Sequence, residues 1–263
     1  MTPSKRSFLT MSCVLAVFMG YLANTAMATE VSCQLKQDNR VSQLVHFAEV
    51  PRLSDVTLAC LNTLSVSEQD IDWDRSTLRK ITISAPIFSN VLASDINLSD
   101  VFAQSAFNEF NQYVKSPPTS SRVFINLDPD FSRINHPQAN PLLQGEWQLL
   151  LVHLKTPNSV SITGHVANHG QFNWQSGFTA VDYLTASQNM EGISFFDSAV
   201  FVIQPDGIIQ EHPIRQLADT PFKDIAPGAV IYVPFPETLN LMNNQSGKNV
   251  DNQAALILLR EMM

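Results

Sequence analysis

The sequence has little charge and little cysteine for its length of 263 residues. Charged residues make up 15% and hydrophobic residues 44%, which is typical of a folded protein rather than a disordered one. The 16 basic residues against 24 acidic ones give a formal net charge of −8. We therefore expect no nucleic acid or anionic lipid among partners recognised through overall charge.

The motifs of common enzyme classes are absent. The chain has no Gly-x-Ser-x-Gly nucleophile elbow, no Walker loop and no His-Glu-x-x-His zinc motif. His165 and His169 are four residues apart, a spacing that suits a metal on a helix, but here we expect a strand and its turn. The sequence therefore predicts no cofactor and no metal site.

Long apolar runs are absent beyond the N-terminus. Lys5 and Arg6 precede an apolar run over residues 8–22, and residues 26–28 read Ala-Met-Ala. This order predicts a cleavable signal peptide over residues 1–28. Because Ser12 and Gly20 interrupt the short run, we expect a soluble exported protein rather than a membrane-anchored one.

Two cysteines, Cys33 and Cys60, remain after the predicted signal peptide. An oxidising compartment permits a disulfide between them, and two separate buried thiols are the alternative. No third cysteine or histidine completes a zinc-ligand pattern around them.

Residues 159–235 contain a regular succession of short elements. Alternation of apolar and polar residues predicts strands. Thr179 with Asp182 three residues later is a capping-box pattern for a helix, and Pro205-Asp206-Gly207 is a strong hairpin turn. The predicted order is a strand, a helix, a hairpin and a last strand, at residues 160–166, 179–186, 199–210 and 229–233. This order is typical of an α+β unit in which one helix packs on a sheet.

The first half of the chain is predicted to contain strands and one strong helix. Three- and four-residue apolar spacing predicts the helix over residues 99–114. Strands are expected at residues 31–35, 41–47, 121–131 and 147–154, while the periodicity of residues 51–64 does not separate helix from strand. A further helix is expected to end at Met263 and to begin at a cap, Asn249 or Asp251.

Residues 68–74 include four acidic residues at alternate positions. The spacing is like the start of a calcium loop, but Arg75 and Ile81 stand where that loop needs glycine and a closing glutamate. We interpret the segment as a solvated lead-in to a helix.

The order of elements in residues 159–235 resembles the SLBB module, a soluble-ligand-binding β-grasp domain. The module's Val-x-x-x-Gly-x-Val strand matches residues 160–166, and its Pro-Gly turn before the last strand matches Pro227-Gly228. The first turn departs from the pattern, since His169-Gly170 replaces the usual Pro-Gly.

A longer set of motifs resembles the GfcC-like capsule-biosynthesis family, periplasmic proteins encoded with surface-polysaccharide export systems. The motifs are Arg122-x5-Asp128-Pro129-Asp130-Phe131, Asn140-Pro141-x-Leu143-x-Gly145-Glu146, Ser161-Ile162-Thr163-Gly164, Pro205-Asp206-Gly207 and Pro227-Gly228. Before Arg122 the resemblance rests on layout alone.

The resemblance implies an α+β fold with two β-grasp (SLBB-like) domains and a C-terminal helix. The first domain would cover residues 29–158 with a helical insertion at about 62–118, and the second would cover residues 159–236. Residues 237–263 would form a linker and the C-terminal helix, which we expect to pack on the protein's own body; docking on a membrane or a partner is the alternative.

The candidate ligand-binding residues are Arg122, Asp128 and Asp130. In the resembled family an arginine at this place lines a pocket between the domains. A guanidinium presents five donors and favours carboxylates, phosphates or sugar hydroxyls. A structural ion pair of Arg122 with Asp128, Asp130 or another acid is the alternative, and turn formation is the simpler role for the two aspartates.

Two functions follow. The first is a non-enzymatic periplasmic factor in capsular or extracellular polysaccharide assembly and export, with the polysaccharide or its precursor, or an outer-membrane export channel, as partner. The second is a periplasmic polysaccharide-modifying hydrolase that uses Asp128 and Asp130 as paired carboxylates. The absence of catalytic motifs favours the first, so no catalytic residue is assigned.

Overall fold

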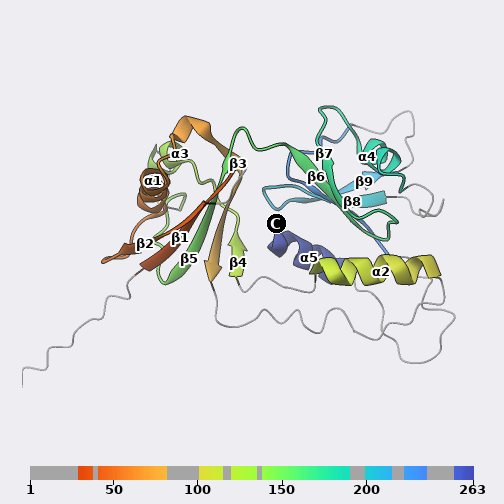
Figure 1. The fold of residues 1–263 in the computed structure, drawn as a ribbon, viewed down its shortest axis with the longest axis horizontal. Helices are drawn as coiled ribbons and strands as arrows, with labels where there is room; N and C mark the ends of the chain where they lie inside the picture. Colours follow the sequence, from red (N-terminus) through yellow and green to blue (C-terminus); the bar gives the residue numbers. More distant parts are fainter. Residues whose placement is uncertain are drawn as a thin grey trace, which may run out of the picture.

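The computed structural model contains two five-stranded mixed sheets that follow one another along the chain (Figure 1). It describes residues 29–37, 41–81, 101–114, 120–134, 138–189, 199–214, 222–235 and 252–263. The predicted α+β class is confirmed. In these ranges no helix has the length and apolar character needed to cross a membrane. The predicted signal peptide at 1–28 lies outside the described residues.

The first sheet has the strand order β2-β1-β5-β3-β4. β1 and β5 are parallel, and the other neighbours are antiparallel. Its elements are β1 (Thr29–Lys36), β2 (Val41–Phe47), α1 (Leu53–Leu64), a 3-10 turn η1 (Glu68–Asp70), β3 (Ile71–Ile81), β4 (Ser120–Val123), α3 (Pro129–Ile134) and β5 (Glu146–His153).

The second sheet has the order β7-β6-β10-β8-β9, with β6 and β10 as its parallel pair. Its elements are β6 (Ser159–Gly164), β7 (Gly170–Asn173), α4 (Ala180–Ala186), β8 (Ala199–Ile203), β9 (Ile209–Pro213) and β10 (Val230–Val233). Counted within each unit, both sheets follow the order second, first, fifth, third, fourth. Thr179 caps α4 with the predicted capping box. β7 is a strand that the sequence pattern did not predict.

Among the described residues, the first sheet packs an apolar core against one of its faces. Val31, Cys33 and Leu35 of β1 point into a core shared with α1, on the side of the sheet that faces away from the second unit (Figure 1). The structure joins Cys33 to Cys60, so a disulfide links β1 to α1 rather than two separate thiols. Because side chains alternate across a strand, the opposite face carries the intervening residues of β1, β3 and β5.

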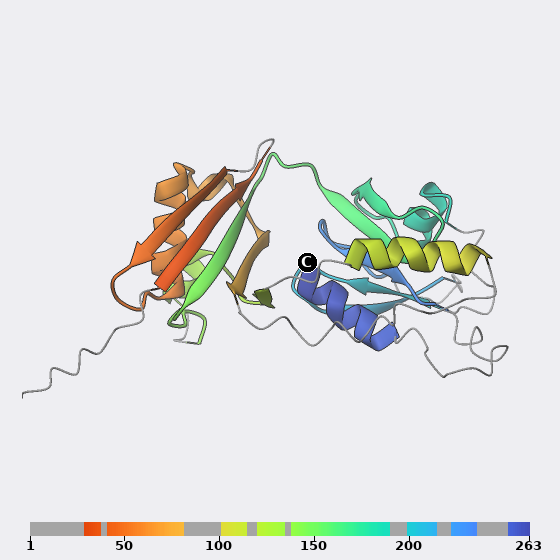
Figure 2. The ribbon, with the colours of Figure 1, turned by 60° about the horizontal axis from the view of Figure 1, so that its bottom comes forward.

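The second sheet is covered on both faces. Val160 and Ile162 of β6 pack against Tyr183 and Leu184 of α4 on one face. On the other face lie two further helices, α2 (Val101–Val114) and α5 (Asn252–Met262), as Figure 2 shows. They bury Phe107, Phe110, Leu258 and Leu259 with Tyr232 and Phe235 in a third apolar cluster.

The predicted helical insertion at about residues 62–118 is wrong in two respects. Ile71–Ile81 forms β3, a strand of the first sheet, so the acidic segment at 68–74 runs into this strand and not into a helix. Helix α2 packs on the second sheet, because its Phe110 ring lies 5.8 Å from both the Tyr232 and the Phe235 ring.

The strand predicted at residues 121–131 is shorter in the structure. β4 ends at Val123, and α3 begins at Pro129. Asn249 and Asp251, the predicted caps of the C-terminal helix, lie outside the described residues.

Replacement of both cysteines (Cys33→Ala with Cys60→Ala) should lower the free energy of unfolding by about 3 kcal/mol, because the crosslink closes a loop of 27 residues. Urea unfolding followed by circular dichroism measures the change. The reduced wild type serves as a control, because it loses the crosslink but keeps both cysteine side chains. Its stability therefore separates the effect of the lost crosslink from that of lost side-chain packing. Equal stability of the oxidised wild type and the double variant would contradict the prediction.

Candidate functional site

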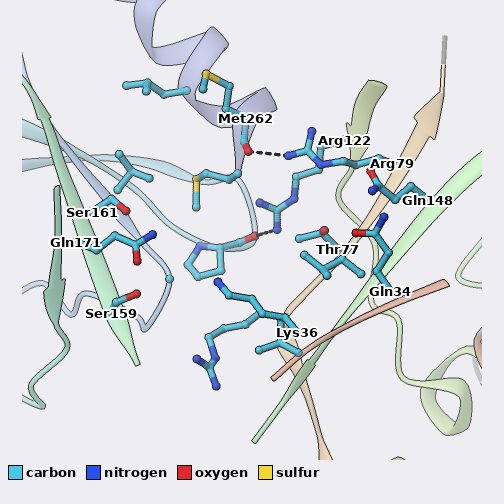
Figure 3. A pocket seen from close by; sticks show the side chains of 18 of the residues that line it. Gln34, Lys36, Thr77, Arg79, Arg122, Gln148, Ser159, Ser161, Gln171 and Met262 are labelled. Atoms are coloured by element: carbon cyan, nitrogen blue, oxygen red, sulfur yellow. Dashed lines mark hydrogen bonds between the residues drawn. The ribbon is translucent and has the colours of Figure 1, made fainter. Parts of the chain in front are cut away.

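A polar cavity of about 570 Å³ lies between the uncovered face of the first sheet and the second unit. Figure 3 shows side chains of the two units facing each other across it. The first unit contributes Gln34, Lys36, Thr77, Arg79, Arg122 and Gln148, and the second contributes Ser159, Ser161 and Gln171.

Strand alternation places these polar side chains in the cavity. In β1, Cys33 and Leu35 enter the apolar core, so Gln34 and Lys36 point to the opposite face. In β6, Val160 enters the core of the second unit, so Ser159 and Ser161 face the cavity.

The last turn of α5 forms one wall of the cavity and is capped by Arg79. The Arg79 guanidinium donates to the carbonyl oxygens of Glu261 at 2.6 Å and Met262 at 2.7 Å. Helix C-terminal carbonyls lack partners within the helix and carry partial negative charge, which the guanidinium offsets. Burial lowers the pKa of Arg79, and the Glu261 carboxylate opposes that shift. Arg79 therefore joins α5 to the first sheet.

Arg122 lies beside Arg79 and reaches the second unit. Its Nη2 donates to the Pro205 carbonyl oxygen at 2.7 Å, and its guanidinium lies 4.6 Å from the Phe124 ring centre. Its backbone N–H donates to Glu261 Oε2 at 3.1 Å. Burial, followed by the positive charge of Arg79, lowers the pKa of Arg122 to about 10, so the side chain stays protonated at neutral pH.

Asp128 and Asp130 do not join Arg122 in the cavity. Asp128 Oδ1 accepts the backbone N–H groups of Asp130 at 2.9 Å and Phe131 at 3.3 Å, and it thereby caps α3. Within the described ranges Arg122 forms no ion pair with either aspartate. The sequence placed the three residues in one site, whereas the structure brings only Arg122 to the cavity.

The cavity is cationic although the whole chain is acidic. Lys36, Arg75, Arg79 and Arg122 line it, and none of its described lining residues is an aspartate or glutamate. Arg75 is paired with Asp72 at 2.8 Å. Arg79 and Arg122 donate their guanidinium hydrogen bonds to neutral carbonyl oxygens, and Glu261 nearby offsets part of their charge. Such a site attracts a negatively charged ligand.

Sequence reasoning missed Lys36, Arg75 and Arg79. The alternation of β1 carried a signal for Lys36, because every second residue of an amphipathic strand shares one face. Arg75 and Arg79 gave no signal, since β3 was not recognised as a strand.

A ring contact fixes how the β8–β9 hairpin meets the first unit. The Phe124 ring has the guanidinium groups of Arg122 and Arg260 at 4.6 and 4.5 Å from its centre. Gly207 in the hairpin has φ of +84°, and a Cβ atom there would lie 2.5 Å from Phe124 Cε1. Only glycine fits both the backbone conformation and the close approach of this ring.

Two comparisons with known proteins bear on this chain. Residues 168–255 match the family described as capsule biosynthesis GfcC C-terminal. The Escherichia coli (strain K12) protein described as "Uncharacterized protein YjbG" is 27% identical over 135 residues, or 51% of this chain and 53% of that protein. The chain thus spans about half the length of this curated relative. The predicted resemblance to the GfcC-like family is confirmed.

Substitution of Gly207→Ala should destabilise the protein more than Gly177→Ala. Both glycines have positive φ, +84° and +80°, but a Cβ at Gly177 would meet nothing within 4 Å. The matched pair therefore isolates the clash with Phe124, which we expect to cost about 1–3 kcal/mol beyond the backbone term. Urea unfolding of both variants measures the difference, and equal losses would show that the ring contact contributes nothing.

Proposed function

We propose that this GfcC-like chain is a non-enzymatic periplasmic protein of capsular or extracellular polysaccharide assembly that binds acidic glycan between its two sheets. The observation that carries the proposal is the cationic lining of the first cavity, to which Lys36, Arg79 and Arg122 contribute. The match to a capsule biosynthesis family supports the process, and the cavity supports binding as the activity.

The chemistry of the cavity suits a uronic acid or a phosphate-bearing sugar. Arg122 uses one guanidinium N–H for Pro205, and the others have no hydrogen-bond partner in the described part of the chain. A guanidinium fork pairs with carboxylate or phosphate oxygens. Amide and hydroxyl groups such as Gln34, Gln148 and Ser161 can exchange hydrogen bonds with sugar hydroxyls.

Three features of the structure support the domain type, the compartment and the non-enzymatic role in this proposal. The repeated strand order of the two sheets supports two β-grasp (SLBB-like) domains. The Cys33–Cys60 disulfide supports an oxidising compartment such as the periplasm. A role without catalysis is supported by Asp128, whose carboxylate caps a helix instead of facing a substrate cavity.

Loss of the cavity cations should weaken binding of acidic glycan. We expect Arg79→Gln and Arg122→Gln to lower affinity at least tenfold, because a charge-assisted hydrogen bond contributes about 1.5–3 kcal/mol. Calorimetric titration of mature protein with fragments of the host cell's surface polysaccharide measures this, beside fragments whose carboxyl groups have been reduced to alcohols.

Lys36→Gln and Lys155→Gln form a matched control. Both lysines are exposed and both variants lose one positive charge, but only Lys36 lines the cavity. We expect a severalfold loss for Lys36→Gln and wild-type affinity for Lys155→Gln. Absence of binding by the wild type, or wild-type affinity in a folded Arg122→Gln variant, would refute glycan binding at this site.

Affinity for acidic glycan should be constant between about pH 6 and 9 and should fall above pH 10. The pKa of Arg122 is lowered to about 10, so its charge is lost at lower pH than for an ordinary arginine. The same titration at pH 7, 9 and 10.5 measures this. The fall should be smaller in Arg122→Gln, and an identical profile in both proteins would exclude Arg122 as its source.

A further inference from the structure

A second cavity of about 840 Å³ adjoins the first. Arg75, Arg122 and Pro205 line both, so these residues form the boundary between the two cavities. The second cavity differs in its walls, which include the Trp73 indole, the Asp74 carboxylate and the Asn126 amide.

A bulge in β3 gives Trp73 and Asp74 their positions. The register of β3 on β5 shifts between Asp72 and Thr77. Ser76 Oγ donates to the Asp72 carbonyl oxygen at 2.7 Å and accepts the Val152 backbone N–H at 3.1 Å. The Ser76 hydroxyl thus links β3 to β5 where the backbone hydrogen bonds between the two strands are interrupted. Bulges re-aim side chains, and this one is held on both sides by hydrogen bonds.

Within the described residues, the Trp73 indole lacks the kind of hydrogen-bond acceptor that the other two tryptophans have. Trp147 Nε1 donates to the Gln144 carbonyl oxygen at 3.1 Å, and Trp174 Nε1 donates to that of Ile225 at 2.7 Å. Among the residues that the structure describes, none accepts a hydrogen bond from Trp73 Nε1. Trp73 packs partly on the first core and also lines the cavity, so an indole ring with a polar N–H belongs to the cavity wall.

Further hydrogen-bonding groups surround the indole. Asp74 is exposed and has no ion pair or hydrogen bond with the described residues. The Asn126 side chain accepts the Asp128 N–H, and Gln210 Oε1 accepts from Gln204. Their amide NH₂ groups have no acceptor in the part of the chain that the structure describes. An aromatic ring among planar donors and acceptors suits a pyranose ring, whose C–H groups meet the indole and whose hydroxyls meet the polar groups.

The charge of the second cavity disfavours an acidic ligand. Its lining residues include four carboxylates (Asp72, Asp74, Asp206 and Asp224) against three cations (Arg75, Arg122 and Lys223), an excess of one negative charge. Asp72 and Arg75 in its wall neutralise each other at 2.8 Å. An acidic sugar would meet like charge here, whereas an uncharged sugar would not.

We propose that the second cavity is a separate subsite for an uncharged sugar residue, held by Trp73 and Asp74. The inference rests on the proposed function in taking the ligand to be glycan, and it adds that the bound polysaccharide contains neutral residues beside acidic ones. The first cavity then binds the acidic sugar residues of a polysaccharide through charge, and the adjoining second cavity binds its neutral sugar residues through contact with the indole ring.

The test uses carboxyl-reduced fragments of the host cell's surface polysaccharide, in which every uronic acid has become a neutral sugar. Full-length mature wild type should bind them with a change in tryptophan fluorescence. Trp73→Phe, which removes the N–H, and Asp74→Asn should each weaken this binding about tenfold, the effect of one lost hydrogen bond to a sugar. Lys155→Gln, an exposed position outside both cavities, should leave it unchanged.

Trp147→Phe is the matched control, because it makes the same chemical change at an indole outside the cavity. Asp74 is exposed, so its variant tests the subsite even where Trp73 variants fold poorly. Wild-type binding of reduced fragments by folded Trp73→Phe and Asp74→Asn, or no binding of reduced fragments where native ones bind, would overturn the subsite and leave the proposed function standing. Binding of neither fragment type would overturn both.

Discussion

The hydrogen bond from Arg122 to the Pro205 carbonyl is a direct contact between the two units, at the boundary of both cavities. It joins β4 at the edge of the first sheet to the β8–β9 hairpin of the second. The same arginine lies over Phe124, and Gly207 in that hairpin allows the close approach to the ring. Both cavities lie against this contact, so their shapes depend on it.

Helix α5 adds a second connection between the units. Its apolar residues Ala255, Leu258 and Leu259 belong to the core of the second unit, while its C-terminal carbonyls accept hydrogen bonds from Arg79 of the first. Glu261 accepts the backbone N–H of Arg122, so the helix end and the two arginines form one network. Packing on the protein's own body, as predicted for this helix, is what the structure shows.

The two cavities divide the charge of an acidic protein unequally. The first gathers lysine and arginine from β1, β3 and β4, and the second gathers exposed aspartates from β3 and from the loops beside β8 and β10. The cationic cavity and the acidic cavity meet at Arg75, Arg122 and Pro205, which line both. A chain with a net charge of −8 can therefore present a local site for an anion.

The sequence by itself determined the local elements, because their signals lie within a few residues. The capping box of Thr179 and Asp182, the turn at Pro205-Asp206-Gly207, the strand at residues 31–35 and the alternation in β6 all appear as predicted. β3 was missed because its bulge and the charged residues at Asp72, Asp74 and Arg75 remove the period-two pattern. Only the tertiary structure decided that α2 packs on the second sheet, that Arg79 and Lys36 join Arg122, and that Asp128 turns away to cap α3. Those outcomes depend on contacts between residues far apart in the chain, which local periodicity does not encode.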